Sequence, residues 1–175
     1  MLRILILVAG ILLASACSTK VKYDVIIRNG DIYDGSGKTH YKADIGIIAD
    51  TIAALGDLSR SKGAAEIDAA GLAVAPGFIN MLSWANESLI EDGRSMGDIL
   101  QGVTLEVLGE GESMGPLNDQ MKADMKNSQS DIRYDVSWTS LGEYLDFLVK
   151  KGVSANVASF IGTQTVRVYT VGYDD

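Results

Sequence analysis

The chain has 175 residues, 47% of them hydrophobic and 22% charged, which is enough apolar material for a folded core and excludes a disordered tail. Its formal net charge is −8 and it has no basic stripe, so a nucleic-acid partner is not expected. The sequence holds one cysteine and one histidine. These counts exclude an internal disulfide framework, a multi-cysteine zinc site and a histidine-cluster metal site within this chain.

The first twenty residues have the pattern of an export signal. Arg3 precedes an uninterrupted apolar run, Ile4 to Leu13, and the small residues 14–16 follow. A positive charge, an apolar run and a small-residue cleavage site are typical of a bacterial signal peptide, and the run is shorter than the about 20 residues of a membrane span. Cys17 comes next, so the segment resembles a lipoprotein signal, in which the cysteine carries the lipid.

This resemblance implies a lipid anchor on Cys17 as the link to a membrane. Because Ser18 rather than an aspartate follows Cys17, the resemblance favours the outer membrane. We therefore expect an exported protein that is lipid-anchored in the periplasm or outer membrane of a Gram-negative-type cell. The alternative is an ordinary signal peptide or membrane anchor with an incidental cysteine.

Residues 21–71 are predicted to form a small antiparallel β meander. Asn29-Gly30 is a strong hairpin signal, because a type I′ turn needs positive φ at both central residues. Further turns are expected at 35–37, 49–50 and 69–71. The strands between these turns are expected at Tyr23–Arg28, 31–33, 43–48, 51–55 and 66–68.

Residues 72–175 change to an alternation of strands and helices, which predicts a parallel sheet. The expected strands are 72–75, which ends in residues 76–80 (PGFIN), Val103–Leu108 and Ala155–Ile161. One helix is expected at 94–101 with Ser95 as its cap. A second is expected at 141–151, capped by Thr139 or Ser140 and closed by Gly152. The polar stretch 109–137 has no strong period, and 121–133 is interpreted as a solvated insertion or a lid.

Five segments in order carry a resemblance to a known family. They are 25–30 (VIIRNG), 33–37 (YDGSG), 44–47 (DIGI), 75–80 (APGFIN) and 101–104 (QGVT). Together they resemble the start of the amidohydrolase superfamily, closest to the N-acyl-D-amino-acid deacylases. The resemblance implies an α/β fold: a small antiparallel β-sandwich part followed by a (β/α)₈ barrel with one or two divalent metals at its mouth. It runs from about Tyr23 to the end of the chain.

The metal ligands of that family are missing where this chain should supply them. The family usually reads Pro-Gly-Phe-Ile-Asp-x-His-x-His, and Leu82 and Trp84 occupy the two histidine positions. Neither side chain can bind Zn²⁺. The position of the family's metal-binding cysteine falls on Gly111. We therefore expect no metal in this chain and at most one divalent metal, such as zinc, in a full-length protein.

Two glutamates that follow the predicted strand 103–108 are candidate catalytic residues. Glu110 and Glu112 follow the predicted strand 103–108, where barrel enzymes keep their catalytic groups. Either could act as a carboxylate ligand or base; the alternative is a pair of solvated loop acids. Trp84 is a candidate for lining a substrate pocket; the alternative is a core or rim aromatic.

A serine-hydrolase site is a poor alternative. Residues 111–115 match G-x-S-x-G around Ser113, but a short motif in a glycine-rich chain arises readily by chance. A nucleophile elbow also needs a helix directly after the serine, where Pro116 stands. The only histidine, His40, lies far upstream and is expected to be an exposed loop residue.

Length sets a further expectation. A (β/α)₈ barrel needs about 250 residues, and 104 remain from Leu72 onward, so at most three strand–helix units fit. We therefore expect the front part of a longer protein: 1–20 signal and tether, 21–71 β-sandwich part, 72–175 a truncated barrel. Alone, this fragment is expected to be catalytically inactive and poorly soluble, with an exposed sheet edge.

The resemblance implies hydrolysis of a non-peptide C–N bond, such as the amide of an N-acyl amino acid. The partner would then be a small-molecule amide. Two alternatives stay open: a non-catalytic binding lipoprotein that has lost the metal ligands, and a surface lipoprotein of unrelated role.

Overall fold

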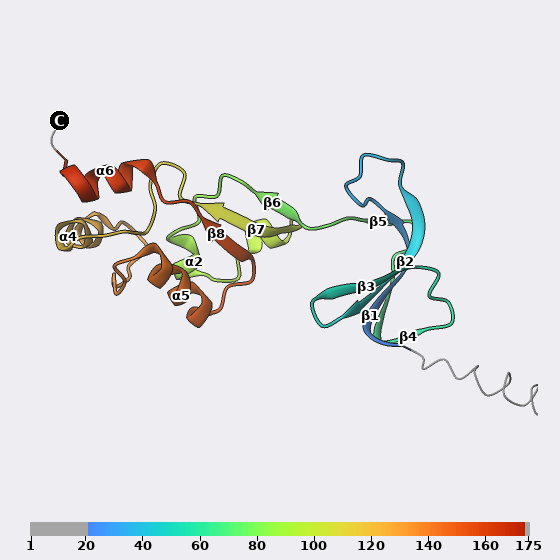
Figure 1. Ribbon diagram of the computed structural model, residues 1–175. Coiled ribbons are helices and arrows are strands. Elements are labelled where there is room, and N and C mark those ends of the chain that lie inside the picture. Colours follow the sequence, from blue (N-terminus) through green and yellow to red (C-terminus); the bar gives the residue numbers. More distant parts are fainter. Residues whose placement is uncertain (1–20, 174–175) are drawn as a thin grey trace, which may run out of the picture. The chain divides into compact units, whose positions relative to one another are not determined.

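The computed structural model describes residues 21–173, and the chain divides into two compact units at Pro76/Gly77. The predicted signal and Cys17 lie outside the described residues. The first unit is a five-stranded sheet and the second is a three-stranded parallel sheet with helices (Figure 1). The protein therefore has a mixed α/β fold. Among residues 21–173, no helix is long and apolar enough to cross a membrane.

The first sheet has the strand order β3-β2-β1-β4, with β5 also paired to β1. Its strands are β1 (Lys22–Ile32), β2 (Tyr41–Ile48), β3 (Thr51–Gly56), β4 (Lys62–Asp68) and β5 (Ala73–Val74). β1, β2 and β3 pair antiparallel as expected, but β4 and β5 both run parallel to β1. The predicted antiparallel meander is therefore wrong in its second half, and the strand predicted at 72–75 pairs in this sheet.

The hairpin predicted at Asn29-Gly30 is also wrong, because β1 continues through both residues. Asn29 alone has a positive φ, 60°, whereas a type I′ turn needs two such residues. The chain instead makes a β-bulge, where the β1–β2 register shifts. The Asn29 backbone N–H donates to Asp44 Oδ1 at 2.9 Å, and its side-chain amide donates to Asp68 Oδ1 at 3.1 Å. Side chains from both neighbouring strands thus stabilise the bulge.

Arg28 joins three strands of this sheet. Its guanidinium lies 3.3 Å from Asp44 Oδ2 and 3.0 Å from Glu66 Oε1, and donates to the Leu58 carbonyl at 2.8 Å. The hydrogen bond and charge of Arg28 lower the pKa of Glu66. The bulge and these two ion pairs connect β1 laterally to β2 and β4.

The second unit contains the strands β6 (Phe78–Asn80), β7 (Val103–Leu108) and β8 (Asn156–Ser159), all parallel, with β7 in the middle (Figure 1). The strands predicted at 103–108 and 155–161 are confirmed. The helices are α2 (Ser88–Glu91), α3 (Met96–Ile99), α4 (Asp119–Ser128), α5 (Leu141–Lys151) and α6 (Thr163–Val171). The predicted parallel sheet is therefore present.

The helix predicted at 141–151 is confirmed together with its caps. The Ser140 hydroxyl accepts from the Glu143 backbone N–H at 3.2 Å, and the Glu143 carboxylate accepts from the Ser140 N–H at 2.8 Å. This reciprocal pair is a capping box. Gly152 follows the helix with φ 82°. The Tyr144 and Leu148 side chains are buried on its inner face.

Three helices were not predicted: the one-turn helix α2, and the longer helices α4 and α6. α4 begins at Asn118, whose side chain accepts from the Met121 N–H at 2.9 Å, and Met121 is buried. The interpretation of 121–133 as a simple solvated insertion is therefore wrong for α4. α6 occupies the apolar segment near the end of the chain. The helix predicted at 94–101 is shorter, and the Ser95 hydroxyl caps no backbone N–H.

The core of the second unit lies between the helices and the end of β7. Trp138 is its largest side chain, and its indole N–H donates to the Met114 carbonyl at 2.7 Å. Tyr144 and Phe147 of α5 pack against the Trp138 ring, each with a centroid separation of 5.2 Å. The remaining buried members are Leu89, Ile90, Leu108, Met114, Leu117, Met121 and Leu148. This core holds the loops that follow the three strands.

Candidate functional site

The carboxyl ends of β6, β7 and β8 lie at one edge of the sheet because the three strands are parallel. In open and closed α/β sheets this edge is where ligands bind. Backbone hydrogen bonds hold the segments after β6 and β8 against the end of β7: Ser83 N–H donates to the Val107 carbonyl at 3.0 Å, and Phe160 N–H donates to the Leu108 carbonyl at 2.9 Å. The segments that leave the three strands therefore start side by side.

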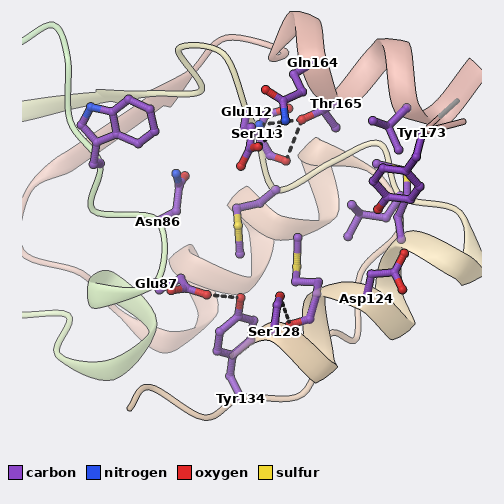
Figure 2. A pocket seen from close by; sticks show the side chains of 16 residues that line it. Asn86, Glu87, Glu112, Ser113, Asp124, Ser128, Tyr134, Gln164, Thr165 and Tyr173 are labelled. Atoms are coloured by element: carbon purple, nitrogen blue, oxygen red, sulfur yellow. Dashed lines mark hydrogen bonds between the residues drawn. The ribbon is translucent and has the colours of Figure 1, made fainter. Parts of the chain in front are cut away.

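A cavity of about 600 Å³ opens beside these loops (Figure 2). Its wall comes from the segments after β6 and β7, from α4 and from α6. The lining residues are Trp84, Asn86, Glu87, Glu112, Ser113, Met114, Leu117, Met121, Asp124, Met125, Ser128, Tyr134, Gln164, Thr165, Val168 and Tyr173. A volume of this size accommodates a small organic molecule.

Three carboxylates line the cavity, and each accepts a hydrogen bond from a neutral group. Tyr134 O–H donates to Glu87 Oε1 at 2.7 Å, and Gln164 Nε2 donates to Glu112 Oε1 at 2.7 Å. Asp124 Oδ1 accepts from Gln120 Nε2 at 2.8 Å. Desolvation by burial, followed by the bond to Glu87, raises the pKa of Tyr134. The phenol therefore stays protonated and remains a hydrogen-bond donor.

Ser113 is buried in this wall and its hydroxyl is fully used. The hydroxyl donates to the Gly115 carbonyl at 2.6 Å and accepts from the Gly162 N–H at 3.0 Å. Its backbone N–H donates to Thr165 Oγ1 at 2.8 Å. These bonds join the loop after β7 to the start of α6. The serine of the G-x-S-x-G match therefore connects two segments of the structure. This agrees with the expectation that a serine-hydrolase site is a poor alternative.

Leu82 and Trp84, which the family resemblance places at its two histidine positions, lie in the loop after β6. Leu82 and Trp84 are exposed there, 54% and 65% respectively, and Trp84 lines the cavity. Glu112 also lines the cavity, whereas Glu110 is exposed in the same loop and does not. The structure thus brings Trp84 and Glu112 to one cavity. Their roles toward a substrate stay predictions.

No group of three or more His, Cys, Asp or Glu side chains in residues 21–173 could hold a metal ion. Leu82 and Trp84 offer no ligand atom, and Gly111 has no side chain. The residues at this strand end therefore do not fit the metal centre that the family resemblance implies. His40 is exposed in the first unit, where its ring stacks on Tyr33 at 4.9 Å.

Sequence reasoning missed the most deeply buried polar group of this unit. Glu106, on β7, is 0% exposed. Its Oε2 accepts from the Ser83 hydroxyl at 2.8 Å and its Oε1 accepts from the Ser95 hydroxyl. The signal was available, because Glu106 is the one acid in the otherwise apolar-rich run Val103–Leu108. Its bonds position the loop that carries Leu82 and Trp84.

Comparisons with known proteins give a consistent relationship. D-aminoacylase from Alcaligenes xylosoxydans xylosoxydans is 33% identical over 149 residues, which cover 83% of this chain and 30% of that protein. A crystal structure of D-aminoacylase superposes with a TM-score of 0.71 at 32% identity, covering 85% of this chain and 31% of that one. The crystal structure of N-acyl-D-glutamate deacylase from Bordetella bronchiseptica, complexed with zinc and a phosphonate inhibitor, superposes with a TM-score of 0.70 at 28% identity. This match covers 84% of this chain and 31% of that one.

No family model matches the chain. The chain spans about 30% of the length of the relatives. A binuclear metal center is described for D-aminoacylase, and zinc for the Bordetella enzyme; both belong to those proteins. The resemblance drawn from the five sequence segments is confirmed: this chain is homologous to the N-terminal 30% or so of the D-aminoacylases and N-acyl-D-amino-acid deacylases of the amidohydrolase superfamily.

Proposed function

We propose that this chain is part of a hydrolase that cleaves non-peptide C–N bonds, such as the amide of an N-acyl amino acid. The observation that carries the proposal is the homology to D-aminoacylase over 83% of the chain, at the level of both sequence and fold. The cavity at the carboxyl ends of the parallel strands supports it, since such edges hold the sites of barrel enzymes. The substrate class is taken from the relatives.

The same proposal covers the architecture. Residues 21–71 would form the β-sandwich part and residues 72–175 the first strands and helices of an incomplete (β/α)₈ barrel, after a signal and tether at 1–20. The three parallel strands β6, β7 and β8 support the barrel part. The pairing of β5 with β1 favours a boundary a few residues later, at Pro76. We expect residues 1–175 alone to be inactive.

The chain's own residues supply walls and positioning in this proposal. Ser113 and Glu106 hold the loops after β7 and β6, and Trp84 and Glu112 face the cavity. Residues at the family's ligand positions do not bind metal, so no step of the reaction is assigned to a metal here. At most one divalent ion, such as zinc, would be present in a full-length enzyme, with ligands from outside the described residues.

A second candidate is a non-catalytic binding protein on the same scaffold. The observation that favours it is the set of replacements at ligand positions, namely Leu82, Trp84 and Gly111. In either case we propose export and lipid attachment at Cys17, with anchoring in the periplasm or outer membrane. The apolar run that precedes this single cysteine supports that placement.

One assay on the native protein separates the two candidates. The protein is isolated from membrane fractions with an antibody raised against residues 23–70 and incubated with N-acetylated amino acids of both configurations. Release of free amino acid, with metal content measured in parallel, supports the hydrolase. Saturable binding of the same compounds without release of amino acid would establish the binding protein and refute the hydrolase.

A further inference from the structure

The first turn of α6 lies directly against the loop that follows β7. The Gln164 backbone N–H donates to the Gly111 carbonyl at 3.0 Å, and the Ser113 backbone N–H donates to Thr165 Oγ1 at 2.8 Å. Ser113 and Thr165 are both buried, at 5% exposed. A side chain at Gly162, which directly precedes α6, would collide with the Gly111 carbonyl oxygen. Glycine at 162 therefore allows the close approach that fixes this loop against α6.

Glu112 stands in the middle of this contact and lines the cavity. Its Oε1 accepts from Gln164 Nε2 at 2.7 Å, so a side-chain amide of α6 holds its carboxylate (Figure 2). The backbone on either side of Glu112 is held by the bonds at Gly111 and Ser113. The same helix thus fixes both the backbone and the side chain of one glutamate. A carboxylate has two acceptor oxygens, so the bond to Oε1 leaves Oε2 for a water or a substrate.

The other glutamate of this loop lacks such support. Glu110 is exposed and does not line the cavity, and its side chain accepts no hydrogen bond from the described residues. A general base has to be held within hydrogen-bond reach of the proton that it removes. Glu112 is oriented toward the cavity by α6, whereas Glu110 is not. The structure therefore distinguishes two glutamates that are equivalent in the sequence.

We infer that Glu112 rather than Glu110 is the general base that this chain contributes, and that Gln164 is the positioning residue that orients it. This inference rests on the proposed hydrolase function. Glu112 accepts a proton from a water molecule while the water oxygen bonds to the amide carbon, and the carbonyl oxygen takes up the negative charge. The C–N bond then breaks as the carbonyl re-forms, and the nitrogen takes the proton from Glu112. A carboxylic acid and an amine leave, and the carboxylate of Glu112 is restored.

A glutamine suits this positioning role because its amide is neutral. The Gln164 amide fixes the carboxylate of Glu112 without bringing a positive charge, which would weaken the affinity of the carboxylate for a proton. The bonds between Ser113 and Thr165 keep the backbone of α6 in place while the side chains of Gln164 and Glu112 stay exposed. Substituting either exposed side chain therefore leaves the buried contact intact.

The test measures kcat and KM for the release of free amino acid by the full protein expressed from its gene. The substrates are N-acetylated amino acids of both configurations. Glu112→Gln keeps the size of the side chain but cannot take up the proton, so kcat should fall by about 100-fold or more. Gln164→Ala removes only the donor that orients Glu112, so kcat should fall by about tenfold while KM stays nearly unchanged.

Two further variants are matched to these substitutions. Gln120→Ala also removes an exposed glutamine whose amide donates to a carboxylate, Asp124 Oδ1 at 2.8 Å, but Gln120 does not line the cavity. Glu110→Gln makes the same change as Glu112→Gln in the same loop, outside the cavity. Both should keep the kcat of the unsubstituted protein. The fluorescence of the buried Trp138 during urea denaturation checks that every variant is folded.

The double variant separates positioning from a structural role. If Gln164 acts through Glu112, Gln164→Ala should lower kcat no further in a protein that already carries Glu112→Gln. The same loss of kcat in both backgrounds would overturn the positioning role. An unchanged kcat in Glu112→Gln, or an equal loss in Glu110→Gln, would overturn the assignment of the base and keep the hydrolase. If the unsubstituted protein releases no amino acid from any of these substrates, the proposed hydrolase is refuted, and this inference with it.

Discussion

Removing the carboxyl group of Glu106 should unfold the second unit more easily than any exposed substitution. The carboxyl is 0% exposed and accepts hydrogen bonds from the Ser83 and Ser95 hydroxyls. In Glu106→Ala, the buried Ser83 hydroxyl loses its acceptor, which costs about 1–3 kcal/mol, and the part-buried Ser95 bond loses about 1 kcal/mol. The free energy of unfolding should fall by about 2–4 kcal/mol.

A near-isosteric substitution separates hydrogen bonding from charge. Glu106→Gln keeps the shape and one acceptor oxygen, and a serine hydroxyl can turn to accept from the new amide. We expect this variant to lose about 1 kcal/mol. Glu110→Ala is the matched control, because Glu110 is an exposed acid in the following loop and should change stability by less than about 0.5 kcal/mol.

The assay is urea denaturation of the full protein followed by the fluorescence of Trp138, which is 2% exposed and reports the core of the second unit. A Glu106→Ala variant as stable as Glu110→Ala would refute the reasoning. A Glu106→Gln variant as unstable as Glu106→Ala would show that charge rather than hydrogen bonding matters. Combining Glu106→Ala with Ser83→Ala should be less than additive, since both remove the same bond.

Three further outcomes follow from the structure. Gly109→Ala should destabilise far more than Gly111→Ala in the same urea assay, because both have positive φ but an added Cβ meets a backbone carbonyl only at Gly109; equal losses would contradict this. Hydrogen bonds from Arg94 lower the pKa of Asp92 to about 2, so the stabilising effect of the ionised Asp92 is present above about pH 4 and is lost as the pH falls toward 2. NMR titration of the Asp92 carboxyl should find a pKa near 2, and Arg94→Gln should raise this pKa. Cys17→Ala should abolish labelling of the protein by radioactive palmitate, whereas continued labelling would exclude this cysteine as the lipid site.

Local patterns were enough for the elements whose reason is local. Helix α5 was predicted with its bounds, because Ser140 and Glu143 form a capping box within three residues and Gly152 ends the helix. Strand β7 was predicted because a run of apolar residues must be buried. α4 was missed because its polar sequence has no strong period, and its one buried residue, Met121, is held by packing from other segments.

The sequence by itself determined the family, since five segments in order carry it. It also predicts that residues 82, 84 and 111 supply no metal ligand. It did not determine whether the chain turns at Asn29-Gly30 or continues there as a strand. Only the tertiary structure decided that, because Asp44 and Asp68 from neighbouring strands hold Asn29 in a bulge. The acidic cavity was decided in the same way. Glu87 and Glu112 are separated in the chain by α2, α3 and β7, and they line one cavity because the parallel strands β6 and β7 end at the same edge of the sheet.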